Sequence, residues 1–276
     1  MPIKLVALDL DGTTLDSAGN LPKLNRLTLE ESISKGIKIV IATGRSYYSL
    51  PKDVTGIKGL EYAVTSNGAQ IRNLLTEEVL FSDCLTPEAV RKAAKIIMEN
   101  NYDTEVFVDG TAYIEKSSWN DIIEGRITYR RISYIKETRK PVDDVVSFML
   151  RNESKVENIN ICFGDMSLKP KIRETLKEVE DIATVTTSFD NNWEIGGLYT
   201  SKANAIIKLG KSLSISKEEI MSIGDSPNDI PMILACGKGV AVGNAKDSVK
   251  AVADYVTLSN DECGVSAAIK KFVTNI

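Results

Sequence analysis

Two aspartates, Asp9 and Asp11, stand two residues apart at the end of an apolar stretch, in the run IKLVALDLDGTTL. Residues i and i+2 of a strand project to the same side, so both carboxylates would leave a sheet together where the strand becomes a loop. Carboxylates in such a place need a compensating partner. The pair therefore predicts a site for a cation or a phosphoryl group. The competing interpretation is that both residues only cap the turn at Gly12.

The chain contains no histidine, and this absence restricts the available chemistry. It excludes Ser-His-Asp and Cys-His catalysis, histidine metal ligation and the usual general base near neutral pH. Proton transfer must then use carboxylates, lysine or tyrosine, and any metal should be a hard ion bound by oxygen. The four cysteines are far apart and form no CxxC pair. Neither a disulfide framework nor a zinc site is predicted.

The composition is that of a soluble globular protein, with 276 residues that are 43% hydrophobic and 26% charged. This length suffices for two domains. A formal charge of −4 disfavours a general nucleic-acid binder. No apolar run approaches the roughly 18 residues of a membrane span, and the amino terminus lacks the regions of a signal peptide. We therefore expect a cytoplasmic protein that has neither membrane nor nucleic-acid partners.

Short apolar segments precede the candidate site residues and are typical of a parallel sheet covered on both faces. They are KLVAL (4–8), IKIVIA (37–42) and EYAVT (61–65). Residues 22–35 form a predicted helix with apolar residues at Leu24, Leu27 and Ile33 and with Gly36 as its C-cap. The first two strands and this helix make a βαβ unit.

A second βα series begins at Ser201, and the segment before it has a different pattern. The series consists of a helix, IMSIG, a helix over 228–235, GVAVG, a short helix, DYVTL and a final helix. Before it, a helix begins at Pro87, and strand-like runs at 104–115, 157–164 and 182–189 alternate with helices around 141–152 and 168–180. We predict an α/β fold: a Rossmann-like, doubly wound core formed by residues 1–83 and 198–276, with an inserted α+β cap at 84–197.

Four predicted strands end in small or polar groups, in DLDGT, ATGR, SNGA and GDSPND. Because ligands of an open parallel sheet bind beyond the carboxyl ends of its strands, these groups favour one shared site. Thr43 and Gly44 offer a hydroxyl and main-chain N–H groups that suit phosphoryl oxygens. Arg45 can contact a substrate phosphate or form a surface ion pair. Asn67 is expected to face the site, although SNG is also an ordinary turn signal.

The fourth strand end and the helix before it add charged groups. Asp225, Asn228 and Asp229 supply oxygen ligands and an amide donor. Lys202 begins the helix SKANAI, from where its ammonium can reach a phosphate. Taken alone, a lysine at a helix end is more often simply solvated.

These motifs resemble the haloacid dehalogenase superfamily of phosphotransferases, and their order matches: DLDGT, the threonine of IATGR, a lysine, and GDxxND. The insert is similar to the large α/β cap of the Cof-type, sugar-phosphatase-like branch (type IIB). The runs SNGA, after the third strand, and NDECGVSAAI, near the end, are similar to that branch too. The resemblance covers essentially the whole chain. Two positions depart from the family pattern: DGTTL replaces the commoner DGTLL, and Ala203 rather than glycine follows the lysine.

The resemblance implies a two-step hydrolysis. Asp9 would be the nucleophile that forms an aspartyl phosphate. Asp11 would be the general acid/base, which protonates the departing alkoxide and later takes a proton from water. The carboxylates of Asp9 and Asp225 and the main-chain carbonyl of Asp11 would bind Mg²⁺.

The resemblance also implies how the remaining residues act. Lys202, Thr43 and Asn228 would bind phosphoryl oxygens, with Gly44 and Arg45 as further substrate contacts. Asp229 would orient Lys202 or a metal-bound water, and Asn67 would support the site.

The predicted function is therefore magnesium-dependent hydrolysis of small phosphorylated metabolites, in particular sugar phosphates. A mutase-type transfer to a second sugar hydroxyl would use the same site. A regulatory protein that binds a phosphometabolite without turnover is the alternative from another class. The intact residues Asp9, Asp11, Lys202 and Asp225 argue against it, since a binding protein needs no nucleophile.

The segment GRITYRRISYIKETRK, residues 125–140, is strongly basic. The default interpretation is a solvated face. The hypothesis beside it is that Arg130, with Tyr129, selects substrates that carry additional anionic or sugar groups. Contact with RNA is a third interpretation, which the acidic chain disfavours.

Overall fold

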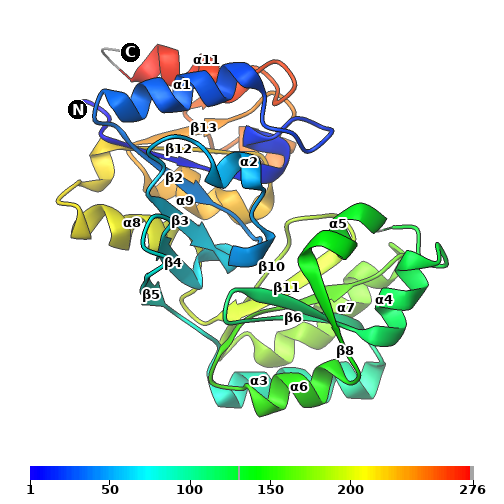
Figure 1. The fold of residues 1–276 in the computed structure, drawn as a ribbon. Coiled ribbons are helices and arrows are strands. Elements are labelled where there is room, and N and C mark those ends of the chain that lie inside the picture. Colours follow the sequence, from blue (N-terminus) through cyan, green and yellow to red (C-terminus); the bar gives the residue numbers. More distant parts are fainter. Residues whose placement is uncertain (130, 274–276) are drawn as a thin grey trace. The chain divides into compact units, whose positions relative to one another are not determined.

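The computed structural model describes residues 1–129 and 131–273, and these form two compact units (Figure 1). The first, here called the core unit, comprises Met1–Gly44, Leu50–Ser82 and the chain from Ser201 onward. The second, here called the inserted unit, comprises Arg45–Ser49 and Asp83–Thr200. Among the described helices, none combines the length and the apolar character that a bilayer span requires.

The core unit is built on one sheet of strand order β14-β13-β12-β1-β2-β3-β4-β5. The six strands from β14 to β3 are parallel, whereas β4 and β5 extend the sheet in antiparallel fashion. The strands are β1 (Leu5–Leu8), β2 (Lys38–Ala42), β3 (Tyr62–Thr65), β4 (Gln70–Asn73), β5 (Val79–Ser82), β12 (Ile220–Gly224), β13 (Lys238–Ala241) and β14 (Tyr255–Val256). The helices are α1 (Lys23–Ser34), α2 (Lys52–Thr55), α8 (Lys202–Ser212), α9 (Ile230–Ala235), α10 (Asp247–Lys250) and α11 (Gly264–Phe272).

Helices cover both faces of the parallel part of the core sheet, which explains why β1, β2, β3 and β12 are mostly apolar. Successive residues of β1 point to opposite faces. Val6 and Leu8 belong to one apolar cluster with α1 and α11, and Leu5 and Ala7 to another with α8 and α9. Figure 1 shows α1 and α11 side by side on one face, although they lie at opposite ends of the sequence. The predicted doubly wound α/β core is confirmed.

Helix α1 follows the predicted range but buries a partly polar face. Leu24 and Leu27 are exposed, whereas Asn25 and Thr28 are buried. The reason is the neighbouring helix: the Thr28 and Ser266 hydroxyls share a hydrogen bond of 2.7 Å between α1 and α11. Polar side chains are tolerated in such a contact because they are paired.

The inserted unit has its own sheet, of order β10-β11-β9-β6-β7-β8. Neighbouring strands are antiparallel except β7 and β8. The strands are β6 (Asp103–Val108), β7 (Thr111–Glu115), β8 (Arg139–Val142), β9 (Val156–Cys162), β10 (Ala183–Thr186) and β11 (Asn192–Gly197). The helices are α3 (Pro87–Asn100), α4 (Lys116–Ile123), α5 (Ile132–Thr138), α6 (Val145–Arg151) and α7 (Leu168–Leu176). Apolar residues of α3, α6 and α7 pack with β6, β9 and β11 in one cluster.

Several elements differ from the sequence prediction. The helix expected around 141–152 begins only at Val145, because residues 139–142 form strand β8. Helices α4 and α5 and strands β4 and β5 were not predicted. Each of α4 and α5 buries a single residue, and β5 is mostly exposed, so these elements lack the apolar pattern that marks the others.

Candidate active site

The turn after β1, residues 9–15 and here called the catalytic turn, places both aspartates beyond the carboxyl end of the strand. The Asp9 N–H donates to the carbonyl of Ile223 on β12 at 3.0 Å. Residues Leu10–Thr14 then form a tight turn in which Gly12 has a φ of +78°. A Cβ atom at Gly12 would lie 2.8 Å from Asp225 Oδ2, so the close approach of these two segments also requires glycine.

Lys202 points into the core unit and is not a solvated lysine. Helix α8 begins at Lys202. Ser201 caps this helix, because its side chain accepts a hydrogen bond from the N–H of Asn204. The Lys202 side chain is 0% exposed, and its Nζ donates to Asp9 Oδ1 at 2.5 Å and to Asp229 Oδ1 at 2.7 Å. Burial disfavours its charge, but attraction by Asp229 and Asp9 outweighs this and holds the pKa of Lys202 above its usual range.

Asp229 uses both of its oxygens within the protein. Oδ1 accepts from Lys202, and Oδ2 accepts from the N–H groups of Asp225 and Ser226, each at 3.0 Å. Asp229 therefore fixes Lys202 and the start of the loop that carries Asp225. This is the arrangement expected of a carboxylate that orients other site residues.

Asp225 is held by two hydroxyl groups. Thr13 Oγ1 donates to its Oδ1 at 2.8 Å and Ser226 Oγ to its Oδ2 at 2.9 Å. Sequence reasoning did not single out Thr13 or Ser226. Both lie close to predicted site residues, Thr13 in DGT and Ser226 in GDS. A hydroxyl side chain near a candidate metal ligand is the sequence signal that could have identified them.

Carboxylate oxygens of Asp9, Asp225 and Asp229 lie within 4.8 Å of one another. Burial is the main reason why the pKa of Asp9 lies well above its usual range. The attraction of Lys202 lowers this pKa, whereas the nearby charges of Asp229 and Asp225 raise it further. Burial and Asp229 raise the pKa of Asp225 to about 6. A cluster of oxygen donors with this excess of negative charge fits a hard divalent cation.

The ends of β2, β3 and β12 meet through a chain of hydrogen bonds. The N–H of Asn67 donates to the carbonyl of Thr43 at 3.0 Å, and Asn228 Nδ2 donates to Asn67 Oδ1 at 3.0 Å. Thr43 is buried, and Asn228 Oδ1 is buried without a hydrogen-bond partner. A Cβ atom at Gly68, whose φ is +108°, would lie 2.2 Å from the carbonyl oxygen of Ser201. The SNG turn therefore packs directly against the start of α8.

Arg45 does not belong to the core unit, which contains the other predicted site residues. Gly44 ends a segment of the core unit, whereas Arg45 belongs to the inserted unit. Its Nη1 donates to the carbonyl of Ser49 at 3.1 Å, and its guanidinium lies 4.9 Å from the ring centroid of Tyr134.

The basic segment is not a uniformly solvated face, because Arg139 is buried. Its guanidinium forms a two-point ion pair with Glu105, with Nε–Oε1 and Nη2–Oε2 distances of 3.0 and 2.9 Å. Burial disfavours the guanidinium charge, but attraction by Glu105 outweighs it and raises the pKa of Arg139 above its usual range. For this residue the default interpretation was wrong.

Two other side chains of the basic segment also have partners within the inserted unit. Arg126 is exposed and pairs with Asp121. The Tyr129 hydroxyl donates to Asp103 Oδ2 at 2.9 Å. Arg130, on which the substrate-selection hypothesis centred, lies outside the described residues.

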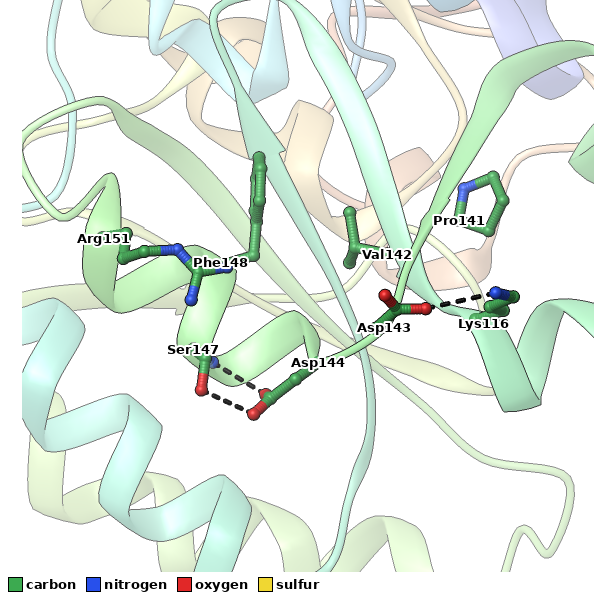
Figure 2. A pocket seen from close by; sticks show the side chains of 8 residues that line it. All are labelled: Lys116, Pro141, Val142, Asp143, Asp144, Ser147, Phe148 and Arg151. Atoms are coloured by element: carbon green, nitrogen blue, oxygen red, sulfur yellow. Dashed lines mark hydrogen bonds and ion pairs between the residues drawn. The ribbon is translucent and has the colours of Figure 1, made fainter.

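A hollow of about 610 Å³ lies on the inserted unit (Figure 2). It is lined by Lys116, Pro141, Val142, Asp143, Asp144, Ser147, Phe148 and Arg151. Figure 2 shows that Asp143 pairs with Lys116 and that Asp144 caps α6 through the main chain and hydroxyl of Ser147. None of the predicted site residues lines this hollow, and its two carboxylates have structural partners.

Comparisons with known proteins agree with the geometry of the core unit. The sequence model of the haloacid dehalogenase-like hydrolases matches residues 6–269. The chain is 30% identical to phosphatase YwpJ of Bacillus subtilis (strain 168) over 97% of this chain and 99% of that protein. It is also 30% identical to the 5-amino-6-(5-phospho-D-ribitylamino)uracil phosphatase YcsE of the same organism, over 98% of this chain and 96% of that protein.

The chain is also similar to a solved structure, and the similarity extends over the residues of both units. The HAD subclass IIB sugar phosphatase BT4131 matches over 98% of each chain, with a TM-score of 0.83 and 25% identity. The order of the strand-end motifs, the matched family and these phosphatase relatives all agree. The chain therefore belongs to the haloacid dehalogenase-like hydrolases and is an enzyme of their Cof-type phosphatase branch.

Proposed function

We propose that this enzyme is a magnesium-dependent hydrolase of small phosphorylated metabolites, sugar phosphates in particular, and that it acts through a phosphorylated Asp9. The observation that carries the proposal is a buried cluster of charged side chains. In it, Lys202 donates hydrogen bonds to Asp9 and Asp229, and Asp225 lies beside them. A protein that only binds phosphometabolites has no need for a nucleophile at this position. The relatives with phosphatase names support the same reaction class. The proposed location is the cytoplasm, with no nucleic-acid or membrane partner.

The proposed reaction begins at the Asp9 carboxylate. Asp9, Asp225 and the main-chain carbonyl of Asp11 would hold Mg²⁺. When bound, the ion supplies positive charge that keeps the carboxylates ionised and offsets the charge of the phosphoryl group. Asp9 attacks phosphorus and forms an aspartyl phosphate, while Asp11 gives a proton to the departing oxygen. Asp11 then takes a proton from the water that cleaves the aspartyl phosphate.

The other strand-end residues would bind the phosphoryl oxygens. Lys202 supplies a fixed positive charge next to Asp9, and Thr43 supplies a hydroxyl. Asn228 has one amide hydrogen on Asn67, which fixes the plane of its side chain. Its buried Oδ1 is an acceptor and suits a water or a protonated ligand oxygen. We further propose that the inserted unit selects the leaving group.

The proposal is tested with the purified chain, Mg²⁺ and a panel of phosphorylated metabolites. We expect steady release of inorganic phosphate from a subset of sugar phosphates. Transfer of the phosphoryl group to a sugar acceptor, without release, would instead identify a mutase. Binding of phosphorylated metabolites without either reaction would identify a regulatory protein.

The leaving group is expected to decide the effect of replacing Asp11. In Asp11→Asn, kcat/KM for an alkyl ester such as glycerol phosphate should fall by roughly 10² to 10⁴, because an alkoxide needs a proton in order to leave. For p-nitrophenyl phosphate the loss should stay within about tenfold, because an acidic phenol leaves without a proton. Equal losses on both esters would assign the general acid to another residue.

Metal binding and pH are expected to act on stability through the same cluster. In the metal-free fold the pKa of Asp225 is about 6, and that of Asp9 is also raised. The folded chain therefore keeps protons that the unfolded chain has released. The stability of the metal-free protein should fall, by on the order of 1–3 kcal/mol for Asp225, as pH rises from about 4 to about 7.

Thermal unfolding with EDTA or Mg²⁺ measures this effect. Mg²⁺ should raise the midpoint more at about pH 7.5 than at about pH 5, since protons compete with the cation at low pH. The control is Asp225→Asn, in which the Mg²⁺-dependent rise should be lost. A rise of the same size in wild type and variant would place the cation elsewhere.

A further inference from the structure

Three asparagine side chains donate to main-chain carbonyls of the catalytic turn. Asn244 Nδ2 donates to Gly12 O at 2.8 Å, Asn25 Nδ2 to Thr14 O at 3.0 Å and Asn260 Nδ2 to Leu15 O at 2.9 Å. We call Asn25, Asn244 and Asn260 the asparagine clamp. They come from α1, from the loop after β13 and from the loop before α11, so segments far apart in sequence hold one short turn.

Two of the three clamp residues, Asn25 and Asn244, are also fixed through their amide oxygens. Asn25 Oδ1 accepts from the N–H of Ser266 at 3.1 Å, and Asn244 Oδ1 accepts from the N–H of Asn260 at 2.9 Å. Asn25 is 0% and Asn260 5% exposed. An asparagine that uses both ends of its amide has a fixed side-chain plane. The clamp therefore ties the catalytic turn rigidly to the segment that begins α11.

Within the turn, the carbonyl of Leu10 accepts from the N–H of Leu15 at 2.9 Å, whereas the carbonyls of Gly12, Thr14 and Leu15 accept from the clamp side chains. Asp11 and Gly12 have non-helical dihedral angles, with ψ of 119° at Asp11 and φ of +78° at Gly12. Buried carbonyls are paired almost without exception in folded proteins. Within the turn, Thr14 Oγ1 donates to the carbonyl of Asp9 at 2.5 Å. This bond is made by the residue at which DGTTL departs from the commoner DGTLL. Asp11 is thus flanked by fixed peptide groups on both sides.

Asp9 depends less on the turn than Asp11 does. The carboxylate of Asp9 is held by Lys202, and its N–H by the carbonyl of Ile223. Asp11 stands in the middle of the turn, directly before the carbonyl that Asn244 holds, and it is only partly buried. Loosening the clamp should therefore displace the acid/base more than the nucleophile.

We propose that the asparagine clamp positions Asp11 for proton transfer, and that this is the role of Asn260 in the NDECG segment before α11. The clamp residues are positioning residues and do not contact the substrate. The inference rests on the proposed phosphatase function, because it assigns to Asp11 the proton of the leaving group.

The test uses Asn244→Ala, because Asn244 is exposed and its loss should leave the fold intact. We expect kcat/KM for glycerol phosphate to fall by roughly tenfold or more, since small displacements of a catalytic group are costly. For p-nitrophenyl phosphate kcat/KM should change by less than about twofold, and inhibition by inorganic phosphate should be unchanged. Asn244→Asp keeps the acceptor for the Asn260 N–H but loses the donor, and should behave like Asn244→Ala.

The matched control is Asn100→Ala in the inserted unit. Asn100 is also exposed, and its Nδ2 also donates to a main-chain carbonyl, that of Ile96 at 2.9 Å. It should leave both esters unaffected. Equal losses on the two esters in Asn244→Ala, or no loss on either, would overturn the positioning role while wild-type turnover still supports the proposed function. Wild-type protein that hydrolyses neither ester would contradict the proposed function and the inference together.

Discussion

Replacing Asp9 with asparagine is expected to abolish phosphate release, with kcat reduced by about 10⁴-fold or more. The amide has nearly the size of the carboxyl group and can still accept from Lys202, which is 2.5 Å away in the wild type. It has no anionic oxygen to attack phosphorus, so the aspartyl phosphate cannot form. Removing the charge of Asp9 should not destabilise the fold, because Asp9 is buried with a raised pKa and Lys202 keeps Asp229 as an anionic partner.

Acid quenching with a phosphate-labelled substrate distinguishes this role from simple damage to the site. Wild-type protein should retain label in the protein fraction, and Asp9→Asn should retain none. Asp53→Asn is the matched control, since the Asp53 side chain is 75% exposed in the core unit. Labelled Asp9→Asn protein, or full activity in this variant, would refute the assignment of the nucleophile.

The sequence was most informative about the core sheet and the strand-end residues. A parallel strand covered on both faces must be apolar throughout, and such runs precede Asp9, Thr43 and Asp225. Topology then brings their carboxyl ends to one edge of the sheet. The gathering of these strand ends at one edge of the sheet could therefore be predicted without any knowledge of side-chain contacts.

Side-chain contacts between segments that are distant in sequence could not be predicted from the sequence pattern. Lys202 pairs with Asp9 across 193 positions, and nothing in SKANAI shows that its lysine is buried. The charge of Arg139 suggested solvent, whereas its partner Glu105 lies on another strand. The asparagine clamp is of the same kind: each amide is an ordinary polar residue until the fold places a turn carbonyl beside it.

Variants of Lys202 can distinguish its contribution to stability from its contribution to catalysis. Lys202→Met keeps the volume of the side chain but leaves Asp9 and Asp229 without their shared cation. Removing one partner of a buried ion pair costs about 3–5 kcal/mol. The activity should fall as well, by roughly 10²-fold or more, because the fixed charge next to the phosphoryl group is lost. Lys95→Met is the matched control, since Lys95 also pairs on a helix but is 71% exposed.

The loss of stability should depend on pH with a definite sign. Without Lys202, the folded chain can relieve the repulsion between the two carboxyl groups only by taking up a proton, which raises their pKa values above those of the unfolded chain. The destabilisation, measured by urea unfolding without metal, should therefore be smaller at about pH 5 than at about pH 8. Adding Asp229→Asn removes one unpaired charge while keeping an acceptor for the N–H groups of Asp225 and Ser226. The double variant should regain stability without regaining activity. If activity returned along with stability, Lys202 would serve the fold alone.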